Sequence, residues 1–82
     1  MSVHLQALTD LMRHNMLQAD RLHLKLLHAA KEIEKDCWGP SMQATLDQEV
    51  HELSVQLAEK LATAAGLAKQ LEAQIRLQRE KP

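Results

Sequence analysis

The chain has 82 residues, with ten basic and eleven acidic side chains that give a formal net charge of −1. A chain of this length holds one small domain, which excludes an enzyme with separate cofactor and substrate domains, and its near-neutral charge gives no field that would attract nucleic acid. Leucine, alanine and glutamine dominate and phenylalanine and tyrosine are absent, so the composition predicts an all-α fold.

The first predicted helix runs from about residue 3 to residue 37, with Ser2 as its expected N-cap. Apolar residues repeat every seven positions and form the seam of a coiled coil. The predicted seam residues are Leu5, Leu8, Met12, Ala19, Leu22, Leu26, Ala29 and Ile33. Asn15 and Asp36 interrupt the seam, and a buried asparagine can fix the register of paired helices at a loss of stability.

The pair Gly39 and Pro40 breaks the helical pattern almost at the midpoint of the chain. Glycine suits the left-handed conformation after a helix end, and proline disfavours a helical residue before it. Ser41 is the expected N-cap of the second helix, while Thr45 and Gln48 resemble a capping box that would start it one turn later. The sequence therefore predicts a turn at Gly39 and Pro40.

The second predicted helix runs from about residue 42 to residue 79. Its apolar stripe has a mean spacing close to 3.6 and consists of Leu46, Val50, Leu53, Leu57, Leu61, Ala64, Ala68, Leu71 and Ile75. Gly66 lowers helix stability by about 1 kcal/mol relative to alanine, so either a close neighbouring helix requires it or a stable helix tolerates it. Because the loop is short, we expect an antiparallel two-helix hairpin that resembles a coiled coil.

The chain carries more large apolar residues than two paired stripes can bury. Leu17 and Leu24 repeat at seven residues on a face rotated away from the seam, whereas Leu11 and Leu27 can also be explained as a widened intramolecular stripe. Each side chain buried on association would contribute about 1.5 to 3 kcal/mol before ordering costs. The predicted partner-binding residues are Leu8, Leu11, Leu17, Leu24, Leu27, Val55 and Leu67.

The histidines and the cysteine lack the number and spacing that a metal site or a disulfide needs. No two of the five histidines are three or four residues apart, so they are expected to be solvated or interfacial, with a pH-sensitive interface as the open alternative. The single cysteine, Cys37, excludes an intrachain disulfide and is interpreted as a packing residue beside Trp38. Without a glycine-rich phosphate loop or a concave pocket, no catalytic residue, cofactor or metal is expected.

The first helix resembles the small helical-hairpin subunit of the needle-protein chaperones of type III secretion systems. The residues that carry the resemblance are Leu8, Thr9, Asp10, Leu11, Met12, Arg13, His14, Ala19, Leu24, Leu26, Ala29, Lys31 and Glu34. The resemblance spans about residues 5 to 71, whereas Trp38 and the alanine-rich second helix have no counterpart in the family. It implies that the chain binds a tetratricopeptide-repeat chaperone and helps to keep the needle subunit soluble and unpolymerised before export, without a cofactor.

The resemblance leaves one alternative function open: a homodimeric four-helix bundle or coiled-coil structural protein, in which the extra leucines contact a second copy. Both functions require protein partners. The longest uncharged stretch is too short to cross a membrane and the N-terminus lacks the regions of a signal peptide, so a bacterial cytoplasmic location is expected.

Overall fold

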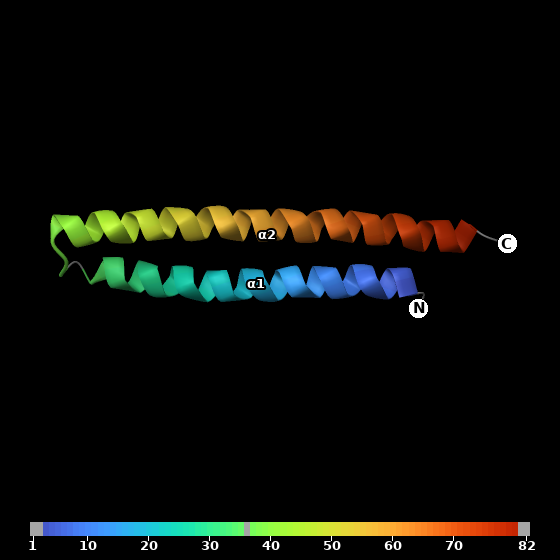
Figure 1. Ribbon diagram of the computed structural model, residues 1–82, viewed down its shortest axis with the longest axis horizontal. Coiled ribbons are helices and arrows are strands. Elements are labelled where there is room, and N and C mark those ends of the chain that lie inside the picture. The colour runs from blue at the N-terminus through green and yellow to red at the C-terminus, as the bar shows by residue number, and fades with distance from the viewer. Residues whose placement is uncertain (1–2, 36, 81–82) are drawn as a thin grey trace.

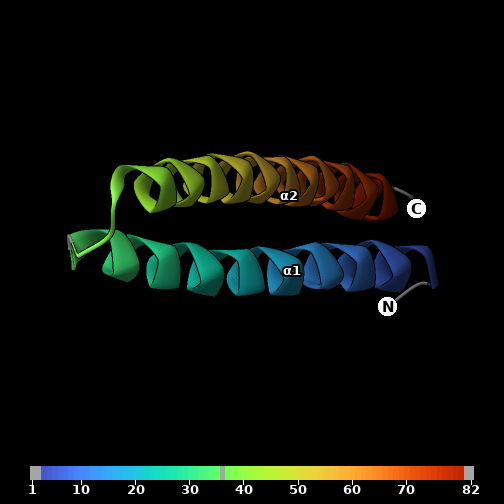
Figure 2. The same cartoon turned by 60° about the vertical axis from the view of Figure 1, so that its left-hand side comes forward.

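The computed structural model describes residues 3–35 and 37–80, which form two long helices (Figure 1). Helix α1 spans Val3–Glu34 and helix α2 spans Pro40–Glu80. The helices run antiparallel and side by side in both views (Figures 1 and 2), and they form a rod of 67 × 15 × 14 Å. The described residues contain no strand. The all-α helical-hairpin prediction is therefore confirmed.

Helix α2 begins earlier than the sequence predicts because Gly39, rather than Ser41, is its N-cap. The Gly39 carbonyl accepts a hydrogen bond of 3.0 Å from the backbone N–H of Gln43, which closes the first turn. Pro40 occupies the first helical position, where its missing N–H removes no hydrogen bond. Gly39 itself does not adopt the left-handed conformation that was expected there.

The predicted capping box is also wrong. The Thr45 hydroxyl donates to the Ser41 carbonyl at 3.1 Å, and the Gln48 amide donates to the Glu52 carboxylate at 3.1 Å. Both residues lie inside α2 and bond along the helix, as threonine commonly does with a carbonyl one turn earlier. The predicted N-cap Ser2 and the predicted seam interruption at Asp36 lie outside the described residues.

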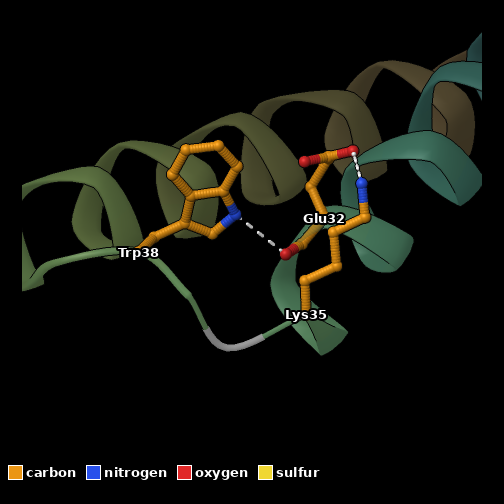
Figure 3. A network of polar contacts seen from close by, with 3 residues as sticks. All are labelled: Glu32, Lys35 and Trp38. Atoms are coloured by element: carbon orange, nitrogen blue, oxygen red, sulfur yellow. Dashed lines mark hydrogen bonds and ion pairs between the residues drawn. The ribbon is translucent and has the colours of Figure 1, made fainter.

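Trp38 satisfies a backbone group at the end of α1, which finishes at Glu34, three residues before the predicted end. Its indole Nε1–H donates to the Glu32 carbonyl at 3.0 Å, and the Glu32 carboxylate accepts from the Lys35 ammonium at 2.9 Å (Figure 3). The last four carbonyls of a helix have no partner within it, so the indole takes over one of them. The Lys35 bond also lowers the pKa of the Glu32 carboxyl and raises that of Lys35.

Both helices face each other through a seven-residue repeat. On α1, every predicted seam residue is buried or half-buried, and Asn15 shares the seam with them. On α2, the seam alternates steps of three and four, and its residues are Gln43, Leu46, Val50, Leu53, Leu57, Lys60, Ala64, Leu67, Leu71 and Gln74. This average step of about 3.5 is the repeat of a coiled coil.

The predicted stripe of α2 is correct as far as Leu57 and again at Ala64 and Leu71, but three of its residues lie outside the seam. Leu61, Ala68 and Ile75 are exposed, and the preceding residues Lys60, Leu67 and Gln74 face α1 instead. A stripe with a spacing of 3.6 runs straight along its own helix, whereas the seam of two paired helices repeats every 3.5 residues, so the two diverge by about 20° per seven residues.

The hairpin core is small. The buried apolar residues of the described chain are Leu5, Leu8, Ala19, Ala29, Leu46, Leu53 and Ala64. The accessible surface is 6381 Å², roughly 1,400 Å² more than a compact protein of this mass exposes. A Cβ built at Gly66 would meet no atom within 4 Å, so a stable helix tolerates this glycine and no close neighbour requires it. The fold leaves an unusually large surface for contacts with other molecules.

Candidate protein-binding surface

The middle of the seam contains no large apolar residue. Asn15 and Ala19 of α1 lie at the same level of the rod as Lys60 and Ala64 of α2, and of these only the two alanines are buried. The Asn15 side-chain amide donates to the Leu11 carbonyl at 2.9 Å, within its own helix. It therefore makes no side-chain bond to α2 of the kind that would fix the register.

Two large apolar residues lie directly beside this polar part of the seam. Met16 follows Asn15 and is 54% exposed, and Leu61 follows Lys60 and is 52% exposed. They line an open groove of about 320 Å³ on one flank of the rod, which we name the flank groove. Its lining residues are Met16, Ala19, Asp20, His23, Leu57 and Leu61. At this level the hairpin places polar residues inside and apolar residues outside.

The opposite flank carries a basic groove at the same level. Arg21 and Lys25 of α1 and Lys60 of α2 line it, together with Leu22 and two glutamines. In the described part of the chain, none of these three cations forms an ion pair. The two flanks of the middle therefore differ in chemistry, one apolar and the other cationic.

The predicted partner-binding leucines of α1 lie on the surface. Leu17 and Leu24 are 53% and 56% exposed and, being seven residues apart, share the outer face of α1, away from α2. Leu11 and Leu27 are also exposed, on the two sides of that face. Whether a partner contacts these residues stays a prediction.

Three predicted contacts lie elsewhere. Val55 is exposed, but its place in the repeat puts it on the outer face of α2, across the rod from Leu24. Leu8 is buried against α2 and Leu67 is half-buried in the seam, so neither is free for a partner and their assignment to the contact surface is corrected. Met16 and Leu61 were not among the predicted contact residues. Each directly follows a polar residue of the seam, which is the sequence signal for an apolar side chain beside the seam.

Other candidate sites are absent from the described residues. No group of three or more histidine, cysteine or acidic side chains could hold a metal ion there. Cys37 is exposed, which corrects its interpretation as a packing residue. Neither described helix has an apolar stretch long enough to cross a membrane.

The comparisons with known proteins add no identification. Protein-family models, curated proteins and solved structures give no match to the chain.

Proposed function

We propose that this chain is the small, helical-hairpin subunit of a chaperone pair. It binds a tetratricopeptide-repeat chaperone in the bacterial cytoplasm and helps to keep the needle subunit of a type III secretion system soluble and unpolymerised before export. The observation that carries the proposal is the exposure of Leu17 and Leu24 on the outer face of α1. Two large apolar side chains on one helix face are the anchors that a helix-binding groove requires.

The outer face of α1 has a pattern suited to a helical-repeat partner. Asp10, Leu17, Leu24 and Lys31 follow one another at seven-residue intervals, so two apolar anchors are flanked by an acidic residue at one end and a basic residue at the other. Stacked helical repeats form an extended concave surface, and a straight convex rod fits such a surface. Burial of the anchors supplies affinity, while the end charges favour one orientation of the rod.

Co-expression with a tetratricopeptide-repeat protein encoded beside this chain tests the proposal. The two proteins should purify as a complex whose melting temperature exceeds that of the hairpin alone, because a partner that binds the folded state stabilises it. Leu17→Gln combined with Leu24→Gln should abolish the complex without loss of helix content.

Val55→Gln is the matched control, since Val55 is an exposed apolar residue on the outer face of the other helix. This variant should bind as the unchanged chain does. A complex that survives the double change in α1, or no complex with any tetratricopeptide-repeat protein encoded beside this chain, would contradict the proposed function.

A further inference from the structure

We propose that the flank groove is the interface of a homodimer, in which the groove of one chain packs against the same groove of a second copy. The two rods are related by a twofold axis perpendicular to their length, at the level of Met16 and Leu61. The dimer is an antiparallel four-helix bundle with α1 against α1 and α2 against α2. This inference concerns a different face of the molecule from the one in the proposed function.

The apolar residues of the groove are arranged for such an axis. Met16 and Leu61 both line the groove and lie within about 3 Å of one level along the rod, because Leu61 follows Lys60, which lies at the level of Ala19. An axis through that level brings Met16 against Met16 of the second copy and Leu61 against Leu61 of the second copy. Side chains that are now 54% and 52% exposed would then form one apolar cluster at the centre of the interface.

The charges beside Met16 are complementary under the same axis. Arg13 and Asp20 are exposed residues of α1 on one column of the repeat, and Asp20 itself lines the groove. They lie on opposite sides of the Met16 level, each about 5 Å from it along the helix. A twofold axis at this level therefore places Arg13 opposite Asp20 of the second copy, and Asp20 opposite Arg13.

Neither charge has an ion-pair partner within the described part of its own chain. The two intermolecular pairs are thus gained without breaking existing ones. On α2, His51 and Glu72 lie on opposite sides of the Leu61 level and meet in the same way, although Glu72 is already paired with Arg76 at 2.7 Å. The charge complementarity of the interface therefore comes mainly from Arg13 and Asp20.

The charges also distinguish this axis from the other twofold arrangement of two rods. An axis along the rod would set α1 against α2 of the second copy. Arg13 would then lie opposite the level of Gly66, with no carboxylate to pair with, because Ala19 and Lys60 lie at one level and the helices run antiparallel. Charge complementarity therefore favours the perpendicular axis.

The available area is sufficient for a stable dimer. A standard protein interface buries about 800 Å² on each partner. The rod exposes roughly 1,400 Å² more than a compact protein of its mass, so it can bury such an area and still have an ordinary surface. The outer face of α1, with Leu17 and Leu24, stays free in this dimer.

Sedimentation equilibrium of the full chain tests the interface. We expect a dimer of the 9.3 kDa chain that dissociates on dilution. Arg13→Asp alone or Asp20→Arg alone turns two attractions into two repulsions and should raise the dimer Kd about tenfold. The double variant restores both pairs with the charges exchanged, so its Kd should return to within about threefold of the original. Lys69→Asp, on the outer face of α2, is the matched control and should change the Kd little.

Cysteine cross-linking locates the axis independently. In a Cys37→Ser chain, Met16→Cys should form an intermolecular disulfide when oxidised glutathione is added, because the axis brings the two copies of this position together. Leu17→Cys, on the outer face, should not. A chain that stays monomeric at every concentration, a double charge variant that fails to recover, or equal cross-linking at both positions would overturn the inference.

The same variants separate this inference from the proposed function. Leu17→Gln with Leu24→Gln should leave the homodimer intact, and Arg13→Asp should leave binding of the tetratricopeptide-repeat partner intact. Loss of the homodimer in the leucine variant would show that the dimer interface has been assigned wrongly, and loss of partner binding in Arg13→Asp would show that the partner surface has been assigned wrongly.

Discussion

The turn end and the middle of the hairpin share one backbone geometry but differ in chemistry. Towards the turn, the seam has an apolar stretch on both helices that ends at Gln43, and its residues are Leu22, Leu26, Ala29, Ile33, Leu46, Val50, Leu53 and Leu57. In the middle, Asn15 and Lys60 occupy the seam while Met16 and Leu61 lie outside it. The turn end holds the hairpin together, and the middle offers its apolar side chains to other molecules.

This difference shows that the seven-residue register is set by the apolar ends of the seam and imposed on its middle. Leu5 and Leu8, near the open end of the hairpin, are each 6% exposed, so apolar side chains pack between the helices again beyond the polar stretch. A local rotation that placed Met16 and Leu61 in the seam would move these leucines out of it.

Removing a buried leucine near the turn should have the largest effect. Leu53 is 8% exposed, and Leu53→Ala should lower the free energy of unfolding by about 3 kcal/mol, through lost burial and the cavity that remains. Leu61→Ala, in the middle, removes a side chain that is 52% exposed and should lower it by less than about 1 kcal/mol. Urea denaturation followed by circular dichroism at dilute, monomeric concentration measures both. Equal losses would contradict the comparison.

Making the middle of the seam apolar should stabilise the isolated hairpin. Lys60 is half-buried at the level of Ala19, whose small side chain leaves room, so Lys60→Leu should raise the free energy of unfolding by about 1 to 2 kcal/mol. Lys69→Leu, on the outer face of α2, is the matched control and should change it by less than about 0.5 kcal/mol. Chemical denaturation measures the free energy of unfolding of both variants. If Lys60→Leu were no more stable than Lys69→Leu, the polar middle of the seam would not limit the stability of the hairpin.

Gly66→Ala should stabilise α2 through helix propensity alone. No atom would contact the added methyl group, so the free energy of unfolding should rise by about 1 kcal/mol. Ala62→Gly, at an exposed position one turn earlier, should lower it by a similar amount. Thermal unfolding measures both variants, and a destabilised Gly66→Ala chain would indicate a close neighbour that this structure lacks.

The ion pair at the turn should have the smallest effect, and it depends on pH. Lys35 lowers the pKa of the Glu32 carboxyl in the folded chain. The pair therefore contributes stability above the ordinary pKa of a glutamate, and that contribution is lost as the pH falls through the lowered pKa. In an NMR titration, Lys35→Gln should return the pKa of Glu32 towards its ordinary value. An unchanged titration of Glu32 would show that Lys35 is not the cause.

The sequence predicts the fold and the seam of α1 because apolar residues occupy nearly every seam position there at seven-residue intervals. On α2, Leu61 and Ile75 compete with Lys60 and Gln74 for the seam, and hydrophobicity alone selects the wrong residue of each adjacent set. The pairing with α1 determines which residue of each pair lies in the seam, because the seam of α2 must contact the seam of α1 along its whole length. That constraint belongs to the pair of helices and is not visible in either helix alone.

Local hydrogen bonds limited the prediction of the turn. Gly39 followed by Pro40 fits an N-cap and first helical position as well as it fits a helix stop, and Ser41 offered a competing cap. The bond from Trp38 to the Glu32 carbonyl spans six residues and follows no sequence pattern. The outer leucines of α1 were predictable because their seven-residue interval places them on one face, whereas the position of Leu61 outside the seam required the register of both helices.

Hydrogen exchange of the unmodified chain, at dilute and at high concentration, tests most directly whether the middle is completed by association. Backbone amides around Met16 and Leu61 should exchange more slowly at high concentration, where a second copy covers them. Amides near the turn, such as those of Ala29 and Leu53, should be protected similarly at both concentrations apart from the overall gain in stability. If amides in the middle exchanged as slowly as those near the turn even in dilute solution, with no dependence on concentration, the middle would not be completed by association.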